Sequence, residues 1–120
     1  MRCDVIVVGA GPAGSTAAAL LARAGLATLL LDRAAFPRHK TCGDAVPMAA
    51  FRIFESLGIA DTIRAAHFNR ICRVVHRNMI DETSIFELNN ADFSTSEAFI
   101  APRYRFDHLL FQHALACGAV

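Results

Sequence analysis

Three glycines follow a short apolar run near the start of the chain, and they constrain its fold more than any other feature. The run Val5–Val8 is rich in β-branched residues, as is usual for a buried parallel strand. Gly9 allows a tight turn, Gly11 lets the backbone approach a diphosphate, and Gly14 lets a helix pack closely on the strands. The spacing predicts a βαβ unit that binds a nucleotide; a glycine-rich turn that only packs a helix on a sheet is the alternative.

The residues after the glycines complete the predicted unit. An alanine- and leucine-rich helix is expected over Ser15–Ala24, with Gly25 at its C-terminal end, followed by a strand over Thr28–Leu31. Asp32 ends that strand, where a carboxylate can accept hydrogen bonds from ribose hydroxyls. Backbone amides and the helix dipole favour an anion at the helix N-terminus, so the backbone alone supplies part of the site.

The uncharged stretch from Val5 to Ala22 is long enough for a membrane span, but its interior argues against one. Its glycines and Pro12 divide it into a strand-length and a helix-length piece, and Asp4 is unlike the basic start of a signal peptide. We therefore expect no transmembrane segment, no export signal and a cytoplasmic location.

Composition excludes some classes of partner. Twelve basic and eleven acidic residues give a net charge of +1 without a basic block, so nucleic acid is not an expected partner and a small molecule is. The four cysteines are widely spaced and form no CxxC pair. No metal site is therefore expected, and the thiols are expected to be free in a reducing compartment.

The rest of the chain predicts an excursion before another parallel strand, which would start at Gly118–Val120. The fold class is therefore α/β: a Rossmann-like domain with a parallel sheet, plus a helix and antiparallel hairpin insertion at residues 45–98. The chain is expected to be the N-terminal part of a larger domain. The expected elements are a polar loop over 33–44, helices over 46–57 and 61–66, an antiparallel pair over 70–77 and 84–88, a loop over 89–97, an extended piece over 99–103 and a helix over 104–117.

Three separated segments resemble the geranylgeranyl reductase family of FAD-dependent oxidoreductases, within the para-hydroxybenzoate hydroxylase-like flavoproteins. They are Asp4–Gly14 with Asp32-Arg33, the loop Phe36–Gly43, and the R-x-x-F-D sequence at 103–107. The first segment is shared by many flavoproteins, whereas the other two are more specific together than either is alone. The resemblance implies FAD rather than NAD as the bound cofactor, with NAD(P)H as a possible electron donor.

The resemblance also implies which residues contact FAD. The pyrophosphate would lie over Gly11–Gly14, which includes Pro12 and Ala13, and the adenosine ribose would lie on Asp32. Arg33 would lie against the adenine, because a guanidinium can stack on an aromatic plane; a solvated surface charge is the alternative.

The two later segments supply further expected contacts. Cys42, Gly43 and Ala45 would lie along the flavin through backbone groups, unless this stretch is a plain surface loop. Arg38 and Lys40 would add positive potential beside the phosphates or a reduced flavin. Arg103 would meet the cofactor unless it forms a surface salt bridge. The expected cofactor-binding residues are Gly9, Gly11, Pro12, Ala13, Gly14, Asp32, Arg33, Arg38, Cys42, Gly43, Ala45 and Arg103.

Other polar side chains are interpreted as structural. Asp107 is interpreted as a charge near a helix N-terminus, His113 as a histidine packed on the apolar stripe of its helix, and His39 as a surface residue. No catalytic residue is assigned, because the family's substrate domain comes after residue 120.

The expected function is reduction of isoprenoid double bonds by hydride transfer from reduced flavin, with electrons from a nicotinamide or ferredoxin donor. An aromatic hydroxylase or monooxygenase, or a flavin-dependent halogenase, is the enzymatic alternative. A non-enzymatic nucleotide-binding module that responds to redox state is the alternative of another class. The substrate would be an isoprenoid lipid or an aromatic compound, and a lipid would favour the membrane periphery. The 120 residues alone are expected to be inactive.

Overall fold

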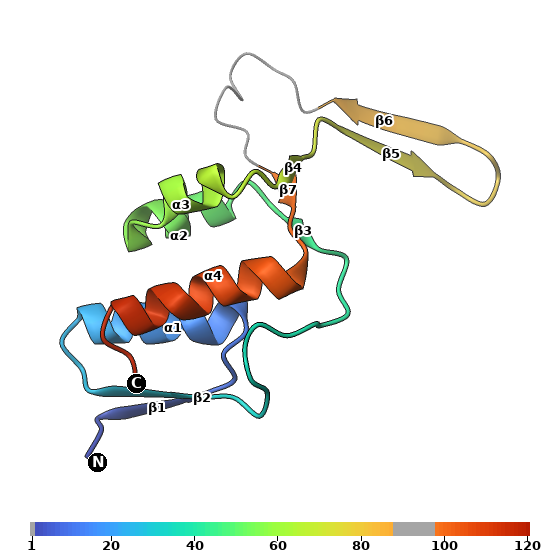
Figure 1. Cartoon of the computed structure of the whole chain (residues 1–120). Coiled ribbons are helices and arrows are strands. Elements are labelled where there is room, and N and C mark those ends of the chain that lie inside the picture. Colours follow the sequence, from blue (N-terminus) through green and yellow to red (C-terminus); the bar gives the residue numbers. More distant parts are fainter. Residues whose placement is uncertain (1, 88–97) are drawn as a thin grey trace.

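A parallel pair of strands with two helices on one face forms the lower part of the molecule in Figure 1. The computed structural model describes residues 2–87 and 98–120. β1 (Val5–Val8) and β2 (Thr28–Leu31) pair in parallel, with Val5 opposite Thr28, and α1 (Pro12–Arg23) connects them. α4 (Arg103–Ala116) packs along α1. The predicted βαβ unit is confirmed.

Local chemistry explains where α1 begins and ends. Pro12 occupies the first helical turn, where its missing N–H costs nothing, so the helix starts three residues earlier than the expected Ser15. Gly25 follows the helix with φ of +86°, a left-handed conformation that glycine adopts without strain.

Residues 45–87 and 98–102 fold above the first layer. In Figure 1 their two helices lie over α4, and a two-stranded hairpin projects away from the rest of the molecule. A small antiparallel sheet in the order β3-β7-β4 lies between them. The elements of these residues are β3 (Ala45–Val46), α2 (Ala50–Leu57), α3 (Ala60–Ala65), β4 (Asn69–Arg70), β5 (Arg73–Arg77), β6 (Thr83–Glu87) and β7 (Phe99–Ile100).

Two boundaries differ from expectation. The helix expected from Val46 starts at Ala50, because Pro47 disfavours a helical conformation for the residue before it, and Val46 instead pairs with Phe99 in a sheet. The strand expected over 70–77 is two strands, since Arg70 pairs with β7 and only Arg73–Arg77 enters the hairpin. The loop expected over 89–97 lies outside the described residues.

A cluster of phenylalanines joins the upper helices to α4. The rings of Phe54 and Phe106 meet edge to face with centroids 6.0 Å apart, and those of Phe68 and Phe99 stack at 5.4 Å. Such pairs contribute about 0.5–1.5 kcal/mol beyond their buried area. The phenylalanines of this cluster are therefore part of the core.

The last residue continues the parallel sheet. The amide of Val120 donates to the carbonyl of Thr28 at 3.0 Å, and the amide of Leu30 donates to the carbonyl of Val120 at 2.7 Å. This alternation is the bonding pattern of a parallel pair. Val120 therefore lies beside β2, as expected for the start of a third strand.

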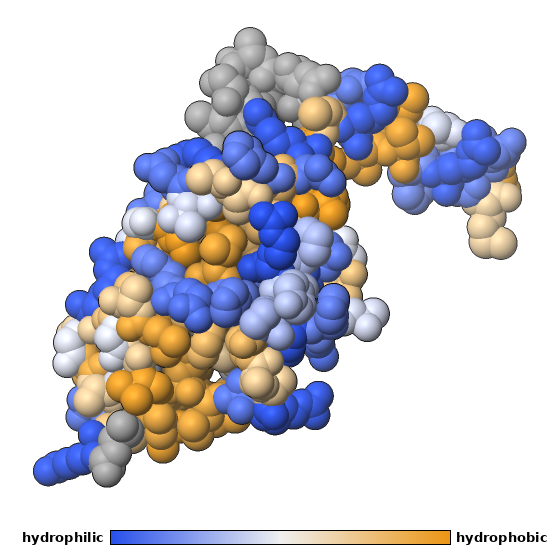
Figure 2. Space-filling view, viewed as in Figure 1, coloured by the Kyte–Doolittle hydropathy of each residue, from blue (hydrophilic) through white to orange (hydrophobic). Residues whose placement is uncertain are grey.

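The strands also present apolar side chains to solvent. Ile6, Val8 and Leu31 are exposed on β1 and β2. Figure 2 shows apolar residues gathered over the lower part of the molecule, where Figure 1 places these strands. Within residues 2–87 and 98–120, none of the helices has both the length and the apolar character that crossing a membrane requires.

Gly14→Ala tests the contact that sets the distance between α1 and the glycine turn. A Cβ at residue 14 would lie 1.7 Å from the carbonyl oxygen of Gly9, which is backbone and cannot move aside cheaply. We expect the variant to lose about 3 kcal/mol or more of unfolding free energy, measured by urea unfolding of the full-length protein. Gly43→Ala is the control, since nothing lies within 4 Å of its Cβ position. Equal unfolding midpoints for the two variants would contradict the contact.

Candidate functional site

A groove of about 800 Å³ lies at the carboxyl ends of β1 and β2, against the N-terminus of α1. Ligands bind at this position in open α/β sheets. The groove brings together nine of the twelve predicted cofactor residues, which are Gly9, Gly11, Pro12, Ala13, Gly14, Asp32, Arg33, Arg38 and Arg103.

The glycine turn leaves the start of α1 open to a ligand. The amide of Gly9 donates to the carbonyl of Leu31 at 2.6 Å, which continues the pairing with β2. Its φ of +102° then turns the chain away from the line of β1. Gly11 is the N-cap and has no side chain to cap the helix, and the first turn carries no acidic residue. The free amides and the helix dipole therefore favour an anion at this end of α1.

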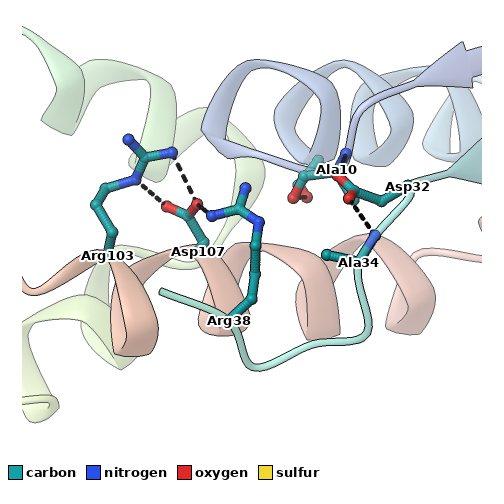
Figure 3. Close-up of polar contacts among 7 residues, drawn as sticks. Ala10, Asp32, Ala34, Arg38, Arg103 and Asp107 are labelled. Carbon is teal, nitrogen blue, oxygen red and sulfur yellow. Dashed lines mark hydrogen bonds and ion pairs between the residues drawn. The ribbon is translucent and has the colours of Figure 1, made fainter. Parts of the chain in front are cut away.

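Asp32 joins the two loops that border the groove. Its carboxylate accepts hydrogen bonds from the amide of Ala10 at 2.7 Å and from the amide of Ala34 at 2.9 Å (Figure 3). The hydrogen bond from Ala34 lowers the pKa of Asp32 most, and the Ala10 bond and the charges of Arg38 and Arg33 lower it further against the opposing effect of burial. Asp32 is thus held as an anion beside the glycine turn.

Asp107 lies at the centre of an ion-pair network. Its side chain is 0% exposed, and both of its oxygens contact Arg103, with Oδ2 2.8 Å from Nη2. Nη1 of Arg38 lies 2.9 Å from the same Oδ2, so one carboxylate holds two guanidiniums (Figure 3). Asp107 lies in the N-terminal part of α4, as interpreted from the sequence, but the sequence does not reveal its burial or its two arginine partners. Its partner Arg38 comes from a loop 69 positions earlier, and no local pattern in the sequence reveals that contact.

The two guanidiniums meet over Gly11. A Cβ built on Gly11 would lie 3.5 Å from Nη2 of Arg38 and 3.7 Å from Nη2 of Arg103. The hydrogen bonds to Asp107 raise the pKa of Arg103 above its already high value, so its charge is permanent. Two cations and a helix N-terminus thus converge on one glycine.

Arg103 also connects the groove to a second hollow. This hollow, of about 370 Å³, shares Pro12, Ala13 and Arg103 with the groove and is otherwise mainly apolar. Of the predicted flavin contacts it includes Cys42 and Ala45, whereas Gly43 lines neither hollow. The amide of Asp44 lowers the pKa of the exposed Cys42 thiol most, and a hydrogen bond from Arg103 lowers it further.

The sequence analysis missed one residue of the groove wall, His39, but did name Lys40. His39 and Lys40 line the groove, and the ring of His39 stacks on Tyr104 with centroids 4.8 Å apart. His113, by contrast, is structural as expected: it is half-buried, and its Nε2 lies 3.1 Å from the carbonyl oxygen of Leu57.

Comparison with known proteins identifies the family. Residues 2–120 match the family model described as FAD binding domain. The chain belongs to this FAD-binding family. Its groove at the glycine turn therefore belongs to a flavoprotein.

Relatives of this FAD-binding chain include enzymes of several kinds. It is 38% identical to a geranylgeranyl diphosphate reductase of Rhodobacter capsulatus over 99% of its length, and 54% identical to a menaquinone reductase of Mycolicibacterium smegmatis over 49%. The structure of the myxobacterial chondrochloren halogenase CndH superposes on 98% of the chain with a TM-score of 0.86 and 31% identity. The chain spans 27%, 14% and 27% of these proteins, respectively.

Acid unfolding tests the state of Asp32. Because its pKa is lower in the folded protein than in an unfolded chain, ionised Asp32 stabilises the fold above about pH 4, and this contribution is lost as the pH falls below that value. We expect the urea midpoint of the full-length protein to fall more steeply from about pH 5 to about pH 3 than that of Asp32→Asn. Asp81→Asn, in an exposed turn, should keep the steep slope. Parallel curves for wild type and Asp32→Asn would argue against the two amide contacts.

Alkylation tests the contact between Cys42 and Arg103. A lowered pKa gives more thiolate at neutral pH, so in the FAD-free full-length protein Cys42 should react several-fold faster with iodoacetamide than the exposed Cys72. Arg103→Gln should slow the reaction of Cys42 and leave that of Cys72 unchanged. Peptide mass spectrometry at several times measures both rates. If Arg103→Gln leaves the Cys42 rate unaltered, the guanidinium does not act on the thiol.

Proposed function

We propose that the full-length protein is an FAD-dependent oxidoreductase that reduces double bonds of an isoprenoid substrate. FAD binding is supported most directly by the position of two guanidiniums, those of Arg38 and Arg103, next to Gly11. Isoprenoid reduction is supported by the 38% identity to geranylgeranyl diphosphate reductase along nearly the whole chain. Geranylgeranyl diphosphate is an isoprenoid and menaquinone carries an isoprenoid chain, so the substrates that the two relatives are named for share this part.

The residues of the groove fit the adenosine diphosphate part of FAD. The free amides at the start of α1, which include that of Ala13, would face the diphosphate together with Arg38 and Arg103. Asp32 would accept hydrogen bonds from the ribose and Arg33 would lie against the adenine. Gly9, Pro12 and Gly14 would act through backbone shape, because they bring the chain close to the ligand without large side chains.

The second hollow fits the flavin end of the cofactor. Its mainly apolar wall suits an aromatic ring system, and its shared residues place it next to the diphosphate site. Cys42, Gly43 and Ala45 would lie along the ring, mainly through backbone groups. Bound there, reduced FAD would supply the hydride chemistry that reduction of a double bond requires.

Several parts of this proposal concern the whole protein. NAD(P)H or a ferredoxin would supply the two electrons, and residues 45–98 would form an insertion within the FAD-binding domain. A lipid substrate would bring the protein to the membrane surface from the cytoplasm. The charges of the chain suit a small molecule rather than nucleic acid.

A flavin-dependent halogenase is the second candidate. The observation in its favour is the likeness to CndH, whose TM-score of 0.86 exceeds the 0.75 found for a geranylgeranyl bacteriochlorophyll reductase-like protein of Thermoplasma acidophilum. An aromatic hydroxylase would likewise use oxygen. Both alternatives differ from the reductase in consuming oxygen in step with product.

The test uses the full-length protein, purified and assayed for bound FAD. With reduced flavin, geranylgeranyl diphosphate and no oxygen, we expect products heavier by two hydrogens for each reduced double bond, detected by mass spectrometry. Gly11→Ala should fold, since its Cβ makes only ordinary contacts, but should bind FAD at least about tenfold more weakly because the methyl group occupies the diphosphate position.

Different failures lead to different conclusions. Bound FAD with halide- and oxygen-dependent turnover of an aromatic substrate would replace the reductase by the second candidate. FAD binding without turnover of either substrate class would favour a non-enzymatic redox module. Protein that does not bind FAD would contradict the cofactor site itself.

A further inference from the structure

We infer that Asp107 is a positioning residue for the diphosphate site: its buried carboxylate orients Arg38 and Arg103 so that both guanidiniums face a diphosphate over Gly11. The inference rests on the proposed FAD site and assigns a role to a residue outside the groove lining. Asp107 contacts the two arginines rather than the ligand, so it acts through them.

The burial of Asp107 restricts the conformations of the arginines that it contacts. The side chain of Asp107 is 0% exposed, and a buried carboxylate is tolerated only where cations and hydrogen bonds compensate it. Arg103 makes a two-point contact with both oxygens, which fixes the plane of its guanidinium as well as its position. An exposed partner would leave a long arginine side chain free to choose among rotamers.

The geometry of Arg38 points to a further acceptor. Its Nη1 lies 2.9 Å from Asp107 Oδ2, yet this buried nitrogen has no aligned hydrogen-bond partner among the described residues. Asp107 therefore holds Arg38 by charge while leaving hydrogen-bond donors available. Nη2 of the same guanidinium lies over Gly11, where the phosphate oxygens would be.

The net charge of Asp107, Arg38 and Arg103 favours binding of an anion. One carboxylate faces two guanidiniums, which leaves one net positive charge over the N-terminus of α1. Without Asp107, two like charges would repel each other at close range and move apart. Without the arginines, Asp107 would be an unpaired buried charge. The arrangement keeps two cations together and still attracts a dianionic diphosphate.

The experiment compares ADP with adenosine. Both probes contain the adenosine part of FAD, but only ADP carries the diphosphate on which the guanidiniums act. Full-length protein is stripped of flavin and shown to rebind FAD, and the two probes are titrated by calorimetry. Failure of the wild-type protein to rebind FAD would contradict the proposed function rather than the role of Asp107.

Asp107→Asn removes the charge and keeps the shape of the side chain. We expect it to weaken ADP binding about tenfold while adenosine affinity stays within about twofold. In an Arg38→Gln/Arg103→Gln background, Asp107→Asn should cause no further loss of ADP affinity, because its effect passes through the arginines. The control Asp61→Asn breaks an exposed helical pair with Arg64 and should change neither affinity.

Two results would overturn the inference. One is an equal loss of ADP and adenosine affinity in Asp107→Asn, which indicates a general role in folding. The other is unchanged ADP affinity in the folded variant. If Asp107→Asn does not fold, Arg103→Lys decides: it keeps the positive charge but not the two-point contact, so ADP affinity alone should fall several-fold. Unchanged ADP affinity in that variant would refute the orienting role.

Discussion

The buried carboxylate of Asp107 holds the loop over 33–44 against α4, and the shape of the groove depends on that contact. The loop is polar and contributes little to the core, so few other interactions fix its path. Phe36 stacks on Phe111 of α4 with ring centroids 4.8 Å apart, and the guanidinium of Arg38 lies 4.8 Å from the Phe36 ring centroid. The ion pair and these contacts together make α4 one wall of a site whose other wall is the glycine turn.

α4 connects the lower layer of the molecule, which contains α1 and the parallel strands, with the upper helices. α4 packs on α1 through its small and apolar residues, and on the upper helices through Phe106. The phenylalanine cluster therefore fixes the upper segment against α4, the helix that also contains Arg103 and Asp107. Contacts with segments that are far apart in the chain therefore meet in the N-terminal half of α4, at Arg103, Phe106 and Asp107.

Much of this could be predicted from the sequence, because the deciding signals are local. The glycine spacing, the β-branched run before it and Asp32 specify the βαβ unit and its groove, since each acts through its immediate neighbours. The position of Val120 beside β2 likewise agrees with what the end of the helix before it predicts. The effect of Pro47 on the residue before it is equally local, so the later start of α2 is also encoded in the sequence.

Other features could not be predicted, because they arise from contacts between distant segments. The pairing of Arg38 with Asp107 and the stacking of His39 on Tyr104 each join the loop to a helix more than sixty residues later. The short strands β3, β4 and β7 are two residues each and exist only because they pair with one another. No propensity or period in so few residues distinguishes them from loop.

The carboxylate of Asp32 can join two loops and still accept hydrogen bonds from a ligand. An ionised carboxylate has about four lone-pair positions, and the amides of Ala10 and Ala34 use one on each oxygen. One position on each oxygen remains, and two is also the number of free hydroxyl groups, 2′ and 3′, on the adenosine ribose of FAD. The same carboxylate can therefore keep two loops joined while it accepts a ligand, so that arrival of the ligand need not break what holds its site together.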